Sequence, residues 1–174
     1  GLTVITPQDV ALADNMMSSI CANPVAWELL DKGKSEQSFW WSHSATGLDL
    51  KCRCDKINGD TVVDLKTTGE GGASPDSFTK TITNFNYHLQ AAHYLQGTGA
   101  TRFVFVVIEK VFPYNIGVYE LDNEFLDNGY ELQEQALLKV SEATKTGKWL
   151  GYTDTEPNGI QTLDKPYWLG NHND

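Results

Sequence analysis

Five stretches of the chain have helical patterns of apolar and polar residues. In the first, Val10, Met16 and Ile20 recur at roughly helical spacing. Thr6 can cap this helix, and Pro7 suits its first turn. The helices are predicted at about residues 6–20, 24–30, 77–83, 86–96 and 122–146.

Strand patterns lie between these helices. Residues 48–57 alternate apolar and polar, and the dipeptide Asn58-Gly59 that follows them is the strongest hairpin signal in the sequence. Residues 103–109 form an almost unbroken apolar run, which suits a central strand. Strands are predicted at 37–41, 48–57, 61–67, 103–109 and 116–121. Together these elements predict one α/β domain over residues 1–174, with a central mixed sheet flanked by helices.

The predicted hairpin gathers polar residues on one face. With Asn58 and Gly59 as the turn, Asp55 faces Val62 across the two strands. Asp64 then lies diagonally from Asp55, about 7–8 Å away between alpha carbons, and strand twist or a bulge must bring the two closer. The opposite face is apolar, with both Cys52 and Cys54 on it by strand alternation. The polar face holds Lys51, Arg53, Asp55, Asp64 and Lys66.

Two carboxylates beside a lysine suit metal-assisted hydrolysis of a phosphodiester. Carboxylates about 4 Å apart repel by roughly 4 kcal/mol at an effective dielectric constant of about 20, and a hard divalent cation removes that repulsion. Asp55 and Asp64, with the backbone carbonyl of Leu65, form a predicted site for Mg²⁺, for which Mn²⁺ is a substitute. Lys66 can orient or deprotonate the attacking water. The alternative is an ordinary solvated salt-bridge face.

Three motifs, in order, resemble the active-site region of one nuclease family, the RecE-like (exonuclease VIII) branch of the PD-(D/E)XK superfamily. The resemblance extends over nearly the whole chain, from Val4 to the closing tail. This sequence departs from the family at Cys54, where proline is usual, and in a slightly shorter spacing between the two Asp residues. The motifs are Cys52-Arg53-Cys54-Asp55-Lys56-Ile57, Val63-Asp64-Leu65-Lys66-Thr67-Thr68 and Tyr87-His88-Leu89-Gln90-Ala91-Ala92-His93-Tyr94.

The resemblance implies roles for individual residues. It identifies Asp55, Asp64 and Lys66 as the metal-binding and catalytic residues. The Gln-x-x-x-Tyr signature of the RecB-type branch matches Gln90 and Tyr94, which lie one turn apart on the predicted helix. Glu36 matches an acidic position of the family and is a candidate metal ligand. Further candidates for supporting the site or binding DNA are Tyr87, Thr67, Arg53, Lys51 and His88.

Each weaker candidate also has a purely structural explanation. Glu36 is also explained as a surface residue at the start of a strand, and His88 as a structural or exposed helical histidine. Lys51 and Arg53 can pair with nearby aspartates instead of phosphates. The aromatic run at 39–41 is predicted to lie in the core instead of stacking on bases.

By resemblance, the activity is Mg²⁺-dependent digestion of linear double-stranded DNA from its ends, 5′ to 3′, leaving single-stranded tails for recombination. A single-strand annealing protein, a homo-oligomer such as a tetramer, and a phage or prophage recombination system follow as expectations. The family also uses a histidine in a helical region upstream of Gly1, so the chain is expected to be a fragment. Two alternatives stay open: another endonuclease or repair nuclease of the superfamily, and a non-catalytic DNA-binding module.

Composition limits these hypotheses. The net charge of −10 counts against a protein that wraps DNA, although few cations along one groove and a metal on the carboxylates can still bind a phosphate. Three cysteines at these positions predict buried thiols instead of a disulfide or zinc site. No window approaches the roughly 20 apolar residues of a membrane span, so a soluble, cytoplasmic protein is expected. The last 25 or so residues are expected to be an extended tail packed on the domain.

Overall fold

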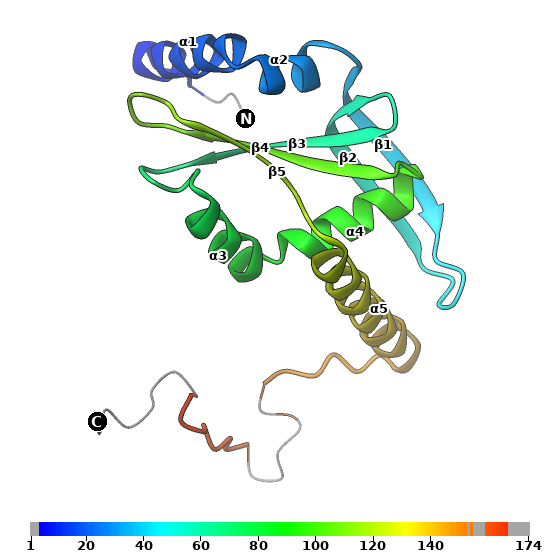
Figure 1. Cartoon of the computed structure of the whole chain (residues 1–174). Coiled ribbons are helices and arrows are strands. Elements are labelled where there is room, and N and C mark those ends of the chain that lie inside the picture. Colours follow the sequence, from blue (N-terminus) through cyan, green and yellow to red (C-terminus); the bar gives the residue numbers. More distant parts are fainter. Residues whose placement is uncertain (1–3, 153, 155–158, 167–174) are drawn as a thin grey trace. The chain divides into compact units, whose positions relative to one another are not determined.

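A five-stranded mixed sheet forms the centre of the first of two compact units, residues 1–137 (Figure 1). The computed structural model describes residues 4–152, 154 and 159–166. The strands lie across the sheet in the order of the sequence, and of the neighbouring pairs β3 and β4 run parallel. Their bounds are β1 Lys34–Ser42, β2 Asp49–Asn58, β3 Thr61–Thr68, β4 Arg102–Glu109 and β5 Ile116–Glu120. The predicted α/β fold with a mixed sheet is confirmed.

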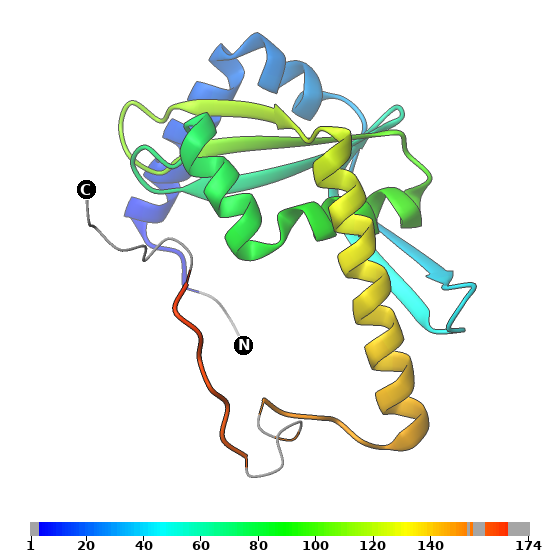
Figure 2. The same cartoon turned by 60° about the horizontal axis from the view of Figure 1, so that its bottom comes forward.

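Helices cover both faces of this sheet (Figure 1 and Figure 2). The first two pack on one face, here called the α1–α2 face, where Ile20 and Ala26 join a core with Val63 and Val106. The next two connect β3 to β4 and lie on the opposite, α3–α4 face. Neighbouring parallel strands require a crossover connection, and these two helices supply it between β3 and β4. The bounds are α1 Pro7–Ala22, α2 Pro24–Asp31, α3 Pro75–Phe85, α4 Tyr87–Thr98 and α5 Asn123–Thr146.

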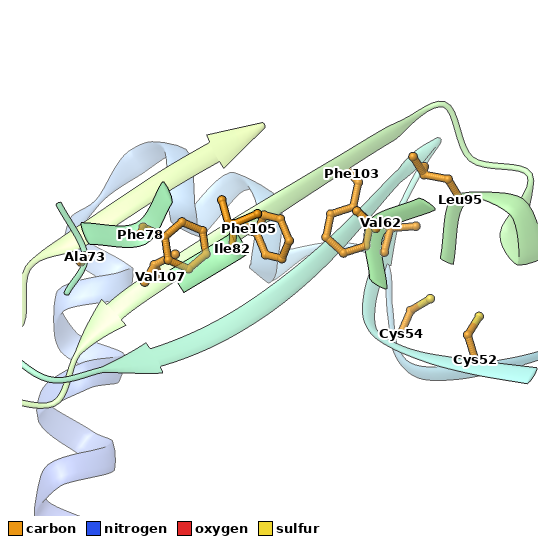
Figure 3. Close-up of a cluster of buried hydrophobic side chains, with 11 residues drawn as sticks. Cys52, Cys54, Val62, Ala73, Phe78, Ile82, Leu95, Phe103, Phe105 and Val107 are labelled. Carbon is orange, nitrogen blue, oxygen red and sulfur yellow. The ribbon is translucent and has the colours of Figure 1, made fainter. Parts of the chain in front are cut away.

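The core on the α3–α4 face is built around aromatic rings. Phe78 of α3 packs edge-on against Phe105 of β4, with ring centroids 5.4 Å apart, and Phe105 also contacts Phe103 at 4.9 Å. Figure 3 shows these rings together with Cys52 and Cys54 of β2, which belong to the same buried cluster. The predicted burial is therefore confirmed for these two thiols and wrong for Cys21, which lies on the exposed side of α1 near its end.

The register of the β2–β3 hairpin differs from the prediction. The turn is Gly59–Asp60, so Asn58 pairs with Thr61, and the same register sets Lys56 against Val63. Gly59 has a φ of 59°, the positive value required at the first central position of a type II′ turn. Continued by one residue, this register would set Asp55 against Asp64, whereas the predicted turn placed it across from Val62. The regular pairing of β2 with β3 ends before that point, at Lys56 and Val63.

The prediction that strand alternation keeps the polar side chains on one continuous face of the hairpin is also wrong near Asp55. Ile57 and Cys54 both pack into the core on the α3–α4 face, although three residues of regular strand would put them on opposite faces. The alternation therefore breaks once near Asp55, where the facing β1 residue, Glu36, has a φ of 54°. Beyond this break β1 and β2 continue without β3 as a two-stranded ribbon (Figure 1).

The second compact unit contains the end of α5 and the residues after it, 138–174. After Thr146 the described residues form no helix or strand. The predicted packing of the tail concerns residues that lie largely outside the described ranges, and the expectation of a single domain stays a prediction. Among the described helices, none combines the length and apolar character that crossing a bilayer requires.

Candidate active site

Asp55 stands at the point where β2 leaves β3. Backbone pairing of the two strands ends at Lys56 and Val63, and past this pair the Asp55 carboxylate replaces the strand partner. Its Oδ2 accepts a hydrogen bond of 2.9 Å from the backbone N–H of Leu65. The N–H and C=O of one strand residue point to the same neighbouring strand, so the Leu65 carbonyl also lies on the Asp55 side of β3.

Asp64 is a buried carboxylate with incomplete hydrogen bonding. Only 2% of its surface is exposed, and its Oδ1 accepts a hydrogen bond of 2.7 Å from Nε2 of Gln90. Its Oδ2 forms an ion pair with Nζ of Lys66, 2.7 Å away, and has no other donor among the described residues. Burial raises the pKa of Asp64, the Lys66 ammonium opposes that shift, and the negative charge of Asp55 adds to it.

Lys66 is held by three different groups. Besides Asp64, its Nζ donates to Oε1 of Gln90 at 3.0 Å and lies 4.4 Å from the ring centroid of Tyr87. The amide of Gln90 therefore donates to Asp64 and accepts from Lys66, which fixes the two side chains relative to each other. A fifth of the Lys66 side chain stays exposed, so the ammonium is positioned by the protein and still reachable from solvent.

The oxygen groups at this point fit a hard divalent cation. Asp55 and Asp64 supply carboxylates, the Leu65 carbonyl lies beside them, and the buried Oδ2 of Asp64 has only the Lys66 ammonium as a partner among the described residues. Mg²⁺ prefers such oxygen ligands and keeps several waters, so two carboxylates suffice for it. Within the described ranges no group of three or more His, Cys, Asp or Glu side chains is placed to hold a metal.

Helix α4 brings the two ends of the predicted Gln-x-x-x-Tyr motif to this cluster. Gln90 contacts both charged partners, and Tyr94 follows one turn later in the helix. Burial raises the pKa of the Tyr94 phenol; a hydrogen bond with Gln90 opposes this, and the charge of Asp64 adds to it. The phenol therefore stays protonated at neutral pH and can act as a hydrogen-bond donor.

Three other candidates lie on the β1–β2 ribbon. Glu36 forms an ion pair with Arg53, with Oε2 2.9 Å from Nε, and both side chains are exposed. Glu36 is thus paired with Arg53, and its role as a metal ligand stays a prediction. Arg53 and Lys51 likewise do not pair with Asp64, which was one of the structural alternatives for them.

Two candidates lie away from a position where they could touch DNA beside the metal site. His88 is 3% exposed, its ring packs edge-on against Phe125 of α5, and Gly129 lies close above its backbone. His88 is therefore a buried residue of α4, and its role in the site stays a prediction. Thr67 follows Lys66 in β3 and so points to the opposite face of the sheet.

The sequence did not indicate how the site residues contact one another. The hydrogen bond from Leu65 to Asp55 and the placement of the Lys66 ammonium over Tyr87 both depend on strands and a helix meeting in space. The aromatic prediction was also incomplete. Trp41 packs on α4, as expected for a core residue, whereas Trp40 is exposed.

Comparisons with known proteins agree with the fold. The model of a family described as a PDDEXK-like domain of unknown function (DUF3799) matches residues 4–155. The chain is also similar in fold to a crystal structure of a protein from Eubacterium rectale that is provisionally called an exonuclease. The TM-score is 0.66 at 17% sequence identity. A second structure, SSO0001, is similar with a TM-score of 0.43, an identity of 18%, and coverage of 75% of this chain and 61% of that one.

The match to the Eubacterium rectale protein covers a larger share of this chain than of that protein. The superposition on the Eubacterium rectale protein covers 91% of this chain but 63% of the other, so this chain spans less than two thirds of that protein's length. No curated protein sequence matches the chain.

Proposed function

We propose that this chain, which belongs to the PDDEXK-like family of domains (DUF3799), is a metal-dependent nuclease that hydrolyses phosphodiester bonds of DNA. The observation that carries the proposal is the cluster at the β2–β3 divergence. Two carboxylates, one of them buried, lie beside a lysine that the protein holds in place. Such an arrangement is costly for stability alone, because burying a carboxylate opposes its charge.

Each residue of the cluster has a chemical task in this proposal. Asp55, Asp64 and the Leu65 carbonyl hold Mg²⁺, which when bound polarises the phosphate and activates a water. Lys66 lies close enough to the carboxylates to orient that water and to stabilise negative charge at phosphorus. Gln90 fixes the Lys66 ammonium and the Asp64 carboxylate relative to each other, since its amide contacts both.

The resemblance of the three motifs supports a narrower form of the proposal. It favours a RecE-like exonuclease that degrades linear double-stranded DNA from its ends, 5′ to 3′, to leave single-stranded tails. It also favours an oligomeric enzyme that acts with a single-strand annealing protein. The fold similarity to the provisionally named exonuclease is consistent with this choice.

The test is digestion of a duplex supplied either as a linear molecule or as a closed circle, with Mg²⁺ or with EDTA. Wild type is compared with Asp64→Asn and with a matched control, Glu131→Gln, on the exposed surface of α5. We expect metal-dependent loss of the linear molecule alone, with a rate at least about 100-fold lower in Asp64→Asn and unchanged in the control.

Other outcomes select the alternatives. Cleavage of the closed circle would identify an endonuclease with the same metal chemistry. A folded wild type that binds Mg²⁺ without cleaving either DNA would favour the non-catalytic module. Failure to bind Mg²⁺ at all would contradict the proposed function.

A further inference from the structure

Two adjacent tryptophans of β1 have opposite environments. The ring of Trp41 lies against α4, where its centroid is 4.8 Å from that of His93 and its ring atoms fill the space beside Gly97. Trp40 points to the other side of the ribbon, and 72% of its surface is exposed. Trp41 thus explains how the ribbon is attached to the domain, and fold stability gives no reason for the large apolar side chain at position 40.

Two cations share the face of the ribbon that carries Trp40. In the β1–β2 ladder Trp40 lies directly opposite Lys51, and Ser38 lies directly opposite Arg53, so the four side chains point to one side. Lys51 has no carboxylate within ion-pair distance in the described part of the chain. Arg53 meets Glu36 through Nε, which leaves its terminal amino groups for another anion.

These residues line a groove together with Tyr94 of α4. Its volume is about 420 Å³. Tyr94, which follows Gln90 by one helical turn, forms one wall, and Arg53 precedes Asp55 by two residues on β2. Tyr94 and Arg53 thus bring the groove next to the candidate active site along the chain, so a strand of nucleic acid whose phosphate is bound by the carboxylates can extend into it. The lining residues are Ser38, Trp40, Lys51, Cys52, Arg53 and Tyr94.

The chemistry of the groove selects an unpaired strand. A base within a duplex has its faces covered by neighbouring bases, whereas an unpaired base can lay a face on an indole. Cations at either side of such an aromatic ring then meet the phosphates, and this combination is how sequence-independent binding of single strands works. In a chain with a net charge of −10, two cations beside an exposed indole are a local exception that fits a polyanion with aromatic bases.

We infer that the groove on the β1–β2 ribbon binds single-stranded DNA adjoining the scissile phosphate, with Trp40 stacking on a base and Lys51 and Arg53 contacting phosphates. The inference rests on the proposed function, because binding of the scissile phosphate at the nuclease site is what would position the adjoining DNA strand in the groove. It assigns to Trp40 a binding role and leaves the chemistry to Asp55, Asp64 and Lys66.

The test measures binding and cleavage separately. Binding of a fluorescein-labelled oligothymidylate is followed by anisotropy in EDTA, where metal-dependent cleavage cannot occur, and cleavage of linear duplex is followed with Mg²⁺. We expect Trp40→Ala to weaken binding about ten-fold and Trp40→Tyr to retain most of it. Phe112→Ala, which removes an aromatic side chain that is 82% exposed on the β4–β5 loop, serves as the matched control.

The cations are tested through the salt dependence of binding. Lys51→Gln and Arg53→Gln should each lower the slope of log affinity against log salt concentration by about 0.7. Lys32→Gln, an exposed lysine at the end of α2, should leave the slope unchanged. Thermal unfolding of each variant confirms that it is folded.

The outcomes separate this inference from the proposed function. Oligothymidylate binding that depends on Trp40, without any cleavage by wild type, would support the groove and contradict the nuclease. Cleavage by wild type with equal binding by wild type and Trp40→Ala would overturn the groove and leave the nuclease intact. Loss of self-association in Trp40→Ala, with unchanged DNA binding, would overturn it as well and assign the indole to an interface between copies.

Discussion

At the scale of single residues, the main feature of the site is that Asp64 is both buried and negatively charged. Asp64 is surrounded by protein, and among the described residues the Lys66 ammonium is the one partner of its Oδ2. A buried carboxylate with unfilled acceptor capacity destabilises the fold and favours a cation at the same time. This is why the same residue that supports the proposed function is expected to limit stability.

Asp64→Asn should therefore raise the free energy of unfolding in the absence of metal, or leave it unchanged, while it abolishes cleavage. Because the pKa of Asp64 is raised in the folded state, its ionised form opposes folding at neutral pH. That unfavourable contribution is present above the raised folded-state pKa and disappears as the pH falls below the unfolded value, near 3.8.

Denaturant titrations of wild type and Asp64→Asn in EDTA, at neutral pH and at pH values approaching 4, check this prediction. The difference between the two proteins should shrink as the pH falls. A variant that is clearly less stable than wild type at neutral pH would contradict it, and would mean that the ion pair with Lys66 outweighs the cost of burial.

Burial also determines which thiols react. Cys54 is fully buried, and desolvation raises its pKa to about 12, while burial raises the pKa of Cys52 as well. Cys21 is exposed on α1. A thiol reagent at neutral pH should label one of the three cysteines in the native protein and all three after unfolding. Mass spectrometry of the labelled peptides identifies the site, and fast labelling of Cys54 would show that β2 opens readily.

At the scale of elements, the decisive feature is the separation of β2 from β3. Past Lys56 and Val63, β2 remains with β1 and β3 remains with β4, and Asp55 fills the gap between them. The ribbon is then attached to the domain chiefly through Trp41 on α4 and through Nε2 of His93, which lies 3.1 Å from the Lys51 carbonyl. The position of Asp55 relative to Asp64 therefore depends on how the ribbon packs on α4.

Gly97→Ala tests this attachment. A Cβ at position 97 would lie 2.3 Å from the Trp41 ring, so the indole must shift. We expect a loss of about 1–3 kcal/mol in the free energy of unfolding, even though alanine favours a helix by about 1 kcal/mol over glycine. Gly69→Ala, with open space around its Cβ and no positive φ, is the control and should change stability by less than about 0.5 kcal/mol.

The double variant Gly97→Ala/Trp41→Phe supplies the decisive comparison by denaturant titration. The smaller ring makes room for the new methyl group, so the two changes together should cost less than their sum. Strict additivity would show that the Trp41 ring and the Gly97 backbone are not coupled.

At the scale of the molecule, metal binding should stabilise the fold. Asp55 and Asp64 come from the two strands that separate, so a cation between them links β2 to β3 beyond their last backbone pair. The melting temperature of wild type should rise with Mg²⁺, by an amount equivalent to about 2.7 kcal/mol at a concentration 100 times the dissociation constant. EDTA should reverse the rise, and Asp64→Asn should show none. An equal rise in both proteins would place the binding elsewhere.

The sequence by itself determined the elements and the identity of the central residues. Helix and strand patterns are local, so the five helices and five strands were predicted close to their observed bounds. The three motifs indicated Asp55, Asp64, Lys66 and Gln90 before their contacts were known, because the residue types and their order carry that signal. The structure brings these four residues together, and their chemical roles stay predictions.

Only the tertiary structure decided the register of the hairpin. Both Asn58-Gly59 and Gly59-Asp60 suit a two-residue turn, and long-range contacts favour the second. In that register Nδ2 of Asn58 donates to the carbonyl of Glu28 at the end of α2, and the Asp60 carboxylate accepts from the backbone N–H of Thr101 before β4. Neither partner is visible to a local pattern.

The break in strand alternation near Asp55 has the same origin. The side chains that pack on α4, including Cys54 and Trp41, turn the ribbon relative to the rest of the sheet. That rotation leaves Trp40 and Lys51 exposed on the far side and sets Asp55 beside Leu65. Packing between distant elements therefore determined which side chains meet, because side-chain burial in a sheet depends on what covers each face and not on alternation alone.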